Sequence, residues 1–119
     1  RQLLMDVLLH AADLSNPARP FELASKWGTA ICDEFFQQGD MEKRMGVPVS
    51  PMCARPDGGN TLSNIAPSQI GFSQFVISPF FGALLKGLDS GNEAGIVGQC
   101  VAQLEQNRER WTALKEGNE

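Results

Sequence analysis

The stretch His10-Ala11-Ala12-Asp13-Leu14-Ser15-Asn16-Pro17 decides the fold, because an apolar helix reaches an acidic residue there and then ends. Asp13 falls in the last turn of that helix, near the negative end of the helix dipole, where a carboxylate needs a cation or several donors beside it. We therefore expect a positive partner close to Asp13. A helix over residues 1–14, packed on one face, is predicted because apolar residues recur every three or four positions: Leu3, Leu4, Val7, Leu8 and Ala11.

The residues around Asp13 leave two explanations open. Asp, Ser, Asn and Pro all favour turns, so the commoner explanation is that Asp13 opens the turn after the helix. The other is a metal half-site, since His10 lies three residues earlier and would share a helix face with Asp13. Two ligands are fewer than the three or four that most metal sites use.

Composition limits the class of protein. The chain has 119 residues, 42% of them hydrophobic and 20% charged, which is typical of one globular domain or a piece of one. The net charge of −4 and the absence of a Lys/Arg cluster argue against a nucleic-acid surface. No apolar run has the length of a membrane span, so none is expected. Three cysteines without a CxxC pair predict a reduced, intracellular and cytoplasmic protein.

A second helix is predicted from Phe21 to Arg44, after two prolines that end the first. It carries an apolar stripe at one-turn spacing, which could be core or the wall of a flat apolar pocket. Core is the commoner role for aromatic residues at helical spacing, so we expect the stripe to be buried. The stripe consists of Leu23, Trp27, Ile31 and Phe35, with Ala24, Ala30 and Phe36 beside them.

Residues 45–67 are rich in Pro and Gly and predict a long ordered loop, in which Met52 and Cys53 fold back on the body of the protein. A third helix is expected from an N-cap at Ser68 to Leu88, largely buried, with a kink at Pro79 and with partners for two buried glutamines, Gln69 and Gln74.

The last helix is expected to open with a Ser90–Glu93 capping box and to run past Leu114. Nothing in the sequence predicts a strand. The fold class is therefore all-α, a helical bundle of four helices.

Several motifs, in this order and at this spacing, resemble the C-terminal part of the catalytic domain of class I 3′,5′-cyclic nucleotide phosphodiesterases. The resemblance extends over nearly the whole chain and implies the C-terminal subdomain of an all-α, HD-type catalytic fold. The motifs are Leu-His-Ala-Ala-Asp-Leu-Ser-Asn-Pro (9–17), Trp27, Glu-Phe-Phe-Gln-Gln-Gly-Asp (34–40), Ser-Pro-Met-Cys (50–53), Ser-Gln-Ile-Gly-Phe (68–72) and Asn-Arg-Glu (107–109).

The family resemblance implies a metal-dependent hydrolase of cAMP or cGMP in cyclic nucleotide signalling. Two divalent ions, Zn²⁺ and Mg²⁺ or Mn²⁺, would activate a bridging hydroxide, and a histidine upstream of this segment would protonate the leaving O3′. By this resemblance Asp13 matches the last of four protein ligands of the zinc ion, whereas His10 is not a ligand. No catalytic residue is expected within the segment itself.

The resemblance also implies a slot for the purine base. Gln69 matches a glutamine whose amide pairs with the base, and Phe72 matches a ring that stacks on it. The resemblance further implies that Ile31 and Phe35 form the opposite wall of the slot, that Asn16 contacts adenine, and that Met52 belongs to the loop that covers the pocket. Asp13 is implied at the substrate as the metal ligand, and Trp27 is implied at the pocket rim.

The chain departs from the family pattern in three places. Ala24 stands where many relatives have a tyrosine, and Gly28 replaces a small polar residue, which predicts a wider pocket edge. The loop between Cys53 and Ser68 is longer and richer in glycine than in familiar branches. The HNxxH and HD motifs, which would supply the other metal ligands and the catalytic histidine, do not occur in these 119 residues.

These departures lead us to expect a C-terminal fragment, 1–119, whose upstream metal-binding half is a required partner. The isolated segment is expected to hydrolyse neither nucleotide, and a homodimer is left open. Asn16 favours cAMP over cGMP, although dual specificity fits as well. The alternatives are a catalytically inactive helical module that binds nucleotides or regulates, and a plain helical interaction domain.

Overall fold

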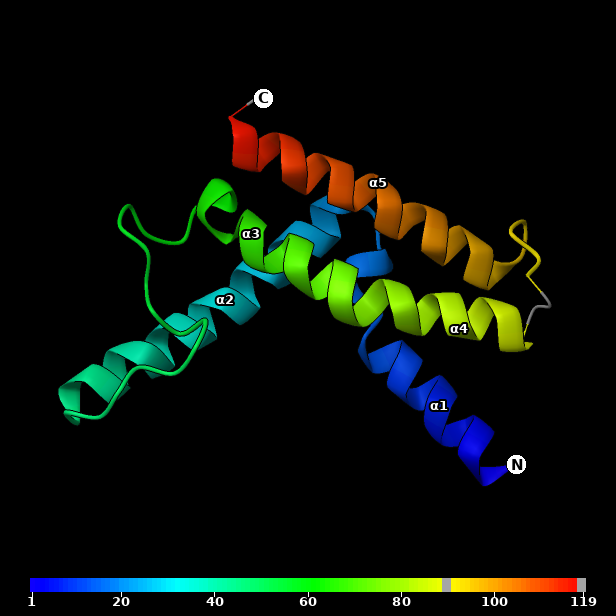
Figure 1. The fold of residues 1–119 in the computed structure, drawn as a ribbon, viewed down its shortest axis with the longest axis horizontal. Coiled ribbons are helices and arrows are strands. Elements are labelled where there is room, and N and C mark those ends of the chain that lie inside the picture. The colour runs from blue at the N-terminus through cyan, green and yellow to red at the C-terminus, as the bar shows by residue number, and fades with distance from the viewer. Residues whose placement is uncertain (89–90, 118–119) are drawn as a thin grey trace.

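The computed structural model describes residues 1–88 and 91–117, and every regular element among them is helical, as predicted (Figure 1). The chain measures 49 × 38 × 19 Å along its principal axes. The elements are α1 (Gln2–Asp13), the 3₁₀-helix η1 (Asn16–Ala18), α2 (Phe21–Arg44), α3 (Leu62–Phe72), the π-helix η2 (Ser73–Ile77), α4 (Ser78–Leu88) and α5 (Ile96–Glu116).

Two apolar clusters hold the helices together. α5 lies along α3 and α4, and α2 crosses beneath α3 (Figure 1). The first cluster joins α2, α3 and α5 and the second joins α4, η2 and α5. The buried members of the first are Phe21, Cys32, Phe36, Ile65, Ala66 and Trp111, and those of the second are Ile77, Phe81 and Leu104.

The bounds of α2 agree with the prediction, but its apolar stripe is buried only at Ala24 and Phe36, and the predicted burial of the other stripe residues is wrong. Trp27 is 51% exposed, and Ile31 and Phe35 are each 38% exposed. The buried face is the neighbouring stripe, one position along the helix, because α3 and α5 pack there. It consists of Phe21, Ala24, Ser25, Gly28, Cys32, Phe36 and Gly39.

The third predicted helix begins earlier than expected. Its N-cap is Thr61, whose side-chain oxygen accepts a hydrogen bond of 3.2 Å from the backbone N–H of Asn64. Ser68 therefore lies inside α3, and Pro67 is tolerated in the helix. The interruption expected at Pro79 takes the form of η2, because a proline cannot donate to the carbonyl four residues earlier and the turns before it widen.

The run from α3 to α4 is less buried than predicted. Phe75 is 75% exposed, and Gln74 is exposed instead of buried. Among the described residues, this 27-residue run, Leu62–Leu88, is long enough to span a membrane, and it contains an 18-residue stretch with a mean hydropathy of 1.2, of which 22% is buried. This evidence is weak, because a core helix meets the same criteria, and α3 and α4 both pack on α5.

The α1 helix is formed as predicted, but it is packed less than expected. It has no fully buried residue, Leu3 and Leu9 are 76% and 74% exposed, and Val7 and Ala11 are partly buried. In Figure 1 the N-terminal end of α1 extends away from the other helices. Periodicity identified the helix but not the location of its partner.

The start of the last helix also differs from the prediction. α5 begins at Ile96 after the N-cap Gly95, later than the expected Ser90. Ser90 lies outside the described residues, so the capping box is not described. The backbone N–H of Ala94 instead donates to Oδ1 of Asn92 over 3.2 Å.

Candidate functional site: an apolar pocket closed by a loop

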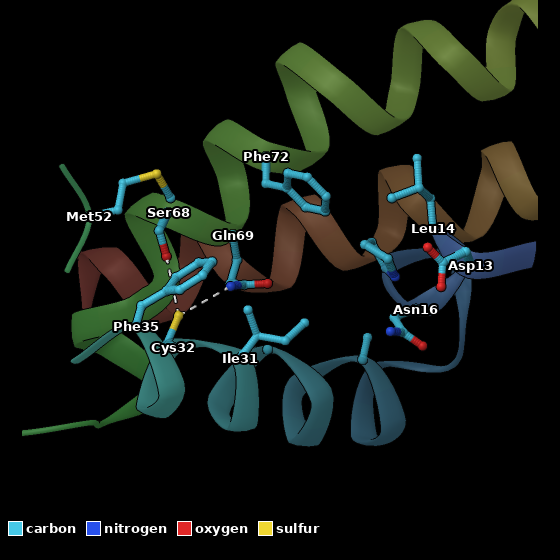
Figure 2. A pocket seen from close by; sticks show the side chains of 13 residues that line it. Asp13, Leu14, Asn16, Ile31, Cys32, Phe35, Met52, Ser68, Gln69 and Phe72 are labelled. Atoms are coloured by element: carbon cyan, nitrogen blue, oxygen red, sulfur yellow. Dashed lines mark hydrogen bonds between the residues drawn. The ribbon is translucent and has the colours of Figure 1, made fainter. Parts of the chain in front are cut away.

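A pocket of about 360 Å³ lies between α2, α3, the link from α1 to α2, and the loop after α2 (Figure 2). In Figure 2 Asp13, Leu14 and Asn16 stand at one end, and Phe35 and Met52 stand at the other. The lining is mostly apolar, which suits a flat organic ring. It consists of Asp13, Leu14, Asn16, Pro17, Ala24, Gly28, Ile31, Cys32, Phe35, Met52, Ser68, Gln69 and Phe72.

The amide of Gln69 is held from one side. Its Nε2 donates to Sγ of Cys32 over 3.5 Å. The Ser68 hydroxyl donates its hydrogen to the carbonyl of Ile65 over 2.7 Å. In the contact between Cys32 Sγ and Ser68 Oγ, which are 3.7 Å apart, the thiol is therefore the donor. The sulfur is then an acceptor for Gln69. This chain of contacts places Nε2 of Gln69 beside Cys32, so that Oε1 points toward Gly28 on the same helix, α2 (Figure 2).

Gly28 gives the Gln69 amide its room. A Cβ atom at position 28 would lie 2.8 Å from Oε1 of Gln69 and 3.0 Å from its Cδ. Contacts this short would force the flexible end of Gln69 to move. Gly28 therefore permits the observed position of the amide.

Aromatic and aliphatic side chains form the two walls beside Gln69. Phe72 follows Gln69 by three residues on α3, so both point to one side of that helix (Figure 2). Ile31 and Phe35, one turn apart on α2, form the opposite wall. All three are partly exposed, at 36% to 38%, because the pocket is open on that side.

Met52 covers one end of the pocket from the loop between α2 and α3. Its backbone has φ of 68°, in the left-handed region that non-glycine residues rarely adopt. The next residue, Cys53, is 5% exposed and packs on α2 at Gly39, where a Cβ atom would lie 1.9 Å from the Cys53 carbonyl oxygen. Gly39 thus lets the loop backbone reach the helix.

Two residues of the same loop, Ser50 and Arg55, form hydrogen bonds with carboxylates of α2. The backbone N–H and the hydroxyl of Ser50 each donate to the Glu42 carboxylate over 2.7 Å. The guanidinium of Arg55 donates to Asp40 over 2.8 Å and 3.0 Å and lies 5.5 Å from the centre of the Phe36 ring. The Ser50 backbone hydrogen bond, followed by the side-chain bonds from Gln38 and Ser50, lowers the pKa of Glu42.

The tip of this loop, residues 57–60, also forms hydrogen bonds with the rest of the protein. The side-chain amide of Asn60 donates to the Thr29 carbonyl of α2 over 3.0 Å, and Asn64 donates to the carbonyls of Asp57 and Gly59. The tip of the loop is therefore held against α2 and α3, although the loop is long.

Asp13 lies at the pocket edge, and its side chain is exposed to solvent. The His10 ring packs on Phe80, with 5.3 Å between ring centres. Within residues 1–88 and 91–117, no three His, Cys, Asp or Glu side chains are grouped as a metal site. The described residues therefore offer Asp13 as one candidate ligand but do not fit a complete metal centre.

Seven of the eight residues singled out from the sequence line this one pocket: Asp13, Asn16, Ile31, Phe35, Met52, Gln69 and Phe72. Trp27, expected at the rim, is exposed on α2 and is not among the lining residues. The contact of Cys32 with Gln69 and its contact with Ser68 could not be predicted from the sequence, because both depend on how α2 and α3 pack.

Comparison with known proteins matches residues 1–94 to the family model described as 3′5′-cyclic nucleotide phosphodiesterase. The dual specificity calcium/calmodulin-dependent 3′,5′-cyclic nucleotide phosphodiesterase 1B of Bos taurus is 44% identical over 80 residues, covering 67% of this chain and 14% of that protein. The probable 3′,5′-cyclic-AMP phosphodiesterase pde-4 of Caenorhabditis elegans is 39% identical over 108 residues, covering 89% of this chain and 14% of that protein.

Solved structures give the same result. LmjPDEB1 in complex with IBMX superposes with a TM-score of 0.79 at 37% identity, covering 97% of this chain and 32% of that one. The phosphodiesterase domain of the Salpingoeca rosetta rhodopsin phosphodiesterase has a TM-score of 0.79 at 30% identity, covering 96% and 32%. The matched segment is thus about a third of each solved chain.

Proposed function

Because the chain belongs to the 3′5′-cyclic nucleotide phosphodiesterase family, we propose that residues 1–119 form the C-terminal part of a catalytic domain that hydrolyses 3′,5′-cyclic nucleotides to 5′-nucleotides. In this reaction a water oxygen bonds to phosphorus, the bond from phosphorus to O3′ breaks, and O3′ takes up a proton. Within this reaction the chain supplies the slot for the base.

The observation that carries the proposal is the Gln69 amide, held by Cys32 inside an apolar pocket between Phe72 and the wall formed by Ile31 and Phe35. A purine base is a flat ring system with hydrogen-bonding groups on its edges, so it needs a narrow apolar slot and a polar group in the ring plane. One Nε2 hydrogen of Gln69 is used on Cys32, which leaves its Oε1 as an acceptor and one N–H as a donor for the base edge. Met52 closes the slot.

Asp13 is proposed as one metal ligand of the complete enzyme. It carries the one carboxylate among the described residues that line the pocket and is exposed, so it is available to a cation beside the bound nucleotide. The remaining ligands of the two divalent ions, and the histidine that protonates O3′, would come from residues outside this segment.

The proposed preference is for cAMP over cGMP. Asn16 lines the same pocket and has a donor and an acceptor to offer a base edge. One relative is named as a cyclic-AMP phosphodiesterase and another as a dual specificity enzyme, so the substrate ratio needs measurement.

The test is hydrolysis of cAMP and cGMP by the full-length protein, with and without Mg²⁺, beside an Asp13→Asn variant. We expect metal-dependent turnover with cAMP preferred. The variant should lose at least about a hundredfold in rate, at or above the 10–100-fold typical for a metal's outer-shell partners. Metal-independent turnover, or full activity in the variant, would contradict the assignment of Asp13.

A second candidate function is a nucleotide-binding module without catalysis. In this module the pocket lined by Gln69 and Phe72 would hold the base without any chemical step. Binding of cAMP by folded, metal-supplied full-length protein without any hydrolysis would support this module over the enzyme.

A further inference from the structure

One end of the pocket is built from a link and not from a long helix. Leu14, Asn16 and Pro17 belong to the segment between α1 and α2, which contains only the single-turn helix η1. Its internal hydrogen bonds are two short backbone contacts, from Ala18 to Ser15 and from Arg19 to Asn16. Such a short turn does not set its own position relative to the rest of the pocket.

Asn107 on α5 is bound to this link. The side chain is buried, with 3% of the residue exposed, and its Nδ2 donates to the carbonyls of Pro17 and Arg19, each over 2.7 Å. Its Oδ1 accepts from Nε2 of Gln103, one turn earlier, over 3.0 Å. Both amide hydrogens of Asn107 are therefore used on the link, 88 and 90 residues away in sequence.

Apolar packing beside Asn107 supports the same attachment. Leu104 precedes Asn107 by one turn and is 2% exposed. Leu14 and Ala18, on either side of Asn16, pack against the cluster that contains Leu104. The packing fixes how deep the link lies against α5, and the two directional hydrogen bonds fix its position along α5.

We propose that Asn107 is a positioning residue for the substrate pocket, which acts through the carbonyls of Pro17 and Arg19 to place Asn16. Asn107 does not line the pocket, so its effect passes through the link. The inference rests on the proposed function, in which Asn16 contacts the base. Loss of the amide leaves two partly buried carbonyls without their donor, which favours displacement of the link.

The first experiment is hydrogen exchange by mass spectrometry on the full-length protein, comparing wild type with Asn107→Ala. We expect faster exchange in the peptide that covers residues 14–20 and little change in the peptide that covers Gln69. Gln106→Ala is the matched control, because it removes an exposed amide from the preceding position of the same helix. Unchanged exchange at residues 14–20 would overturn the proposal, and this readout does not depend on turnover.

The second experiment measures KM and kcat for cAMP in a double-mutant cycle. Asn107→Ala should raise KM about tenfold, comparable to the loss of one well-placed contact, and Gln106→Ala should leave it unchanged. The effects of Asn107→Ala and Asn16→Ala should overlap in the double variant, because both act at one end of the pocket. The effects of Asn107→Ala and Phe72→Ala should simply multiply.

Two further outcomes separate the explanations. If Asn107→Ala does not fold, Gln103→Ala removes only the donor to Oδ1 and should give a smaller change in the same direction. Multiplicative effects for Asn107 with Asn16 would show a general structural role and overturn the proposal. A wild type that hydrolyses no cyclic nucleotide contradicts the proposed function, whereas the exchange result still decides the attachment by Asn107.

Discussion

Phe35 and Phe36 are the same residue type at adjacent positions of one helix, yet they belong to different parts of the molecule. Phe36 is 6% exposed and packs in the cluster with Phe21 and Trp111, whereas Phe35 is 38% exposed and lines the pocket. Adjacent helical positions point about 100° apart, so one faces α3 and α5 and the other faces the pocket opening. We therefore expect the Phe36 ring to contribute mainly to stability and the Phe35 ring to contribute mainly to nucleotide binding.

The largest expected effect is that of Phe36→Ala. Removal of a buried phenylalanine costs about 3–5 kcal/mol of unfolding free energy, since lost transfer energy and a new cavity add together. The loss should be visible in chemical denaturation of the full-length protein. At a temperature where the variant is folded, its KM for cAMP should rise less than that of Phe35→Ala; the opposite order would break the comparison.

Phe35→Ala should do the reverse. Because the ring is partly exposed, we expect a change in unfolding free energy below about 1 kcal/mol. The KM for cAMP should rise about tenfold, which corresponds to about 1.4 kcal/mol. Leu23→Ala is the matched control, since Leu23 lies on the same exposed stripe but outside the pocket lining. A similar rise in KM for Leu23→Ala would show that the stripe acts as a whole.

Gly28→Ala sharpens the comparison, because it should stabilise the helix and weaken binding at once. Alanine favours a helix over glycine by about 1 kcal/mol, but its Cβ would lie 2.8 Å from Oε1 of Gln69 and displace the amide. We expect the KM for cAMP to rise about fivefold, which corresponds to about 1 kcal/mol, the typical net contribution of a hydrogen bond. Gly71→Ala, on α3 where an added Cβ meets nothing within 4 Å, should raise stability and leave KM unchanged.

The smallest effect concerns the loop that carries Met52. The pKa of Glu42 is lowered in the folded protein by the hydrogen bonds from Ser50 and Gln38, so its contribution to stability is present above its ordinary value of 4.5 and is lost as the pH falls. Glu42→Gln should lower Tm slightly at pH 7, and the difference from wild type should shrink as the pH falls below 4.5. A Tm difference that stays the same down to the lowest pH at which the protein is folded would contradict this explanation.

Local signals in the sequence predicted some elements well. The bounds of α2 follow from Pro20 before it and from Gly46 and Pro48 after it, and these signals act within a few residues. The predicted start of α3 at Ser68 is wrong. A proline at position 67 favours a loop, whereas the Thr61 cap and the packing on α5 extend α3 through Pro67. The covered face of α2 depends on which neighbour packs there, so periodicity alone could not identify it.

The residues of the candidate site could also be predicted only in part. Family motifs identified residues that the structure brings together, from Asp13 to Phe72. The bond between Gln69 and Cys32 joins residues 37 positions apart, and the bonds of Asn107 join residues 88 and 90 positions apart. Such contacts depend on tertiary packing, and no motif spacing predicts them.

The central claim, that this pocket binds the base of a cyclic nucleotide through Gln69, is tested most directly by one pair of variants in the full-length protein. Gln69→Ala removes the amide inside the pocket, and Gln74→Ala removes an exposed amide five residues later in the same helical run. The account predicts a KM for cAMP at least about tenfold higher for Gln69→Ala and an unchanged KM for Gln74→Ala. Equal KM values for wild type and Gln69→Ala would contradict it.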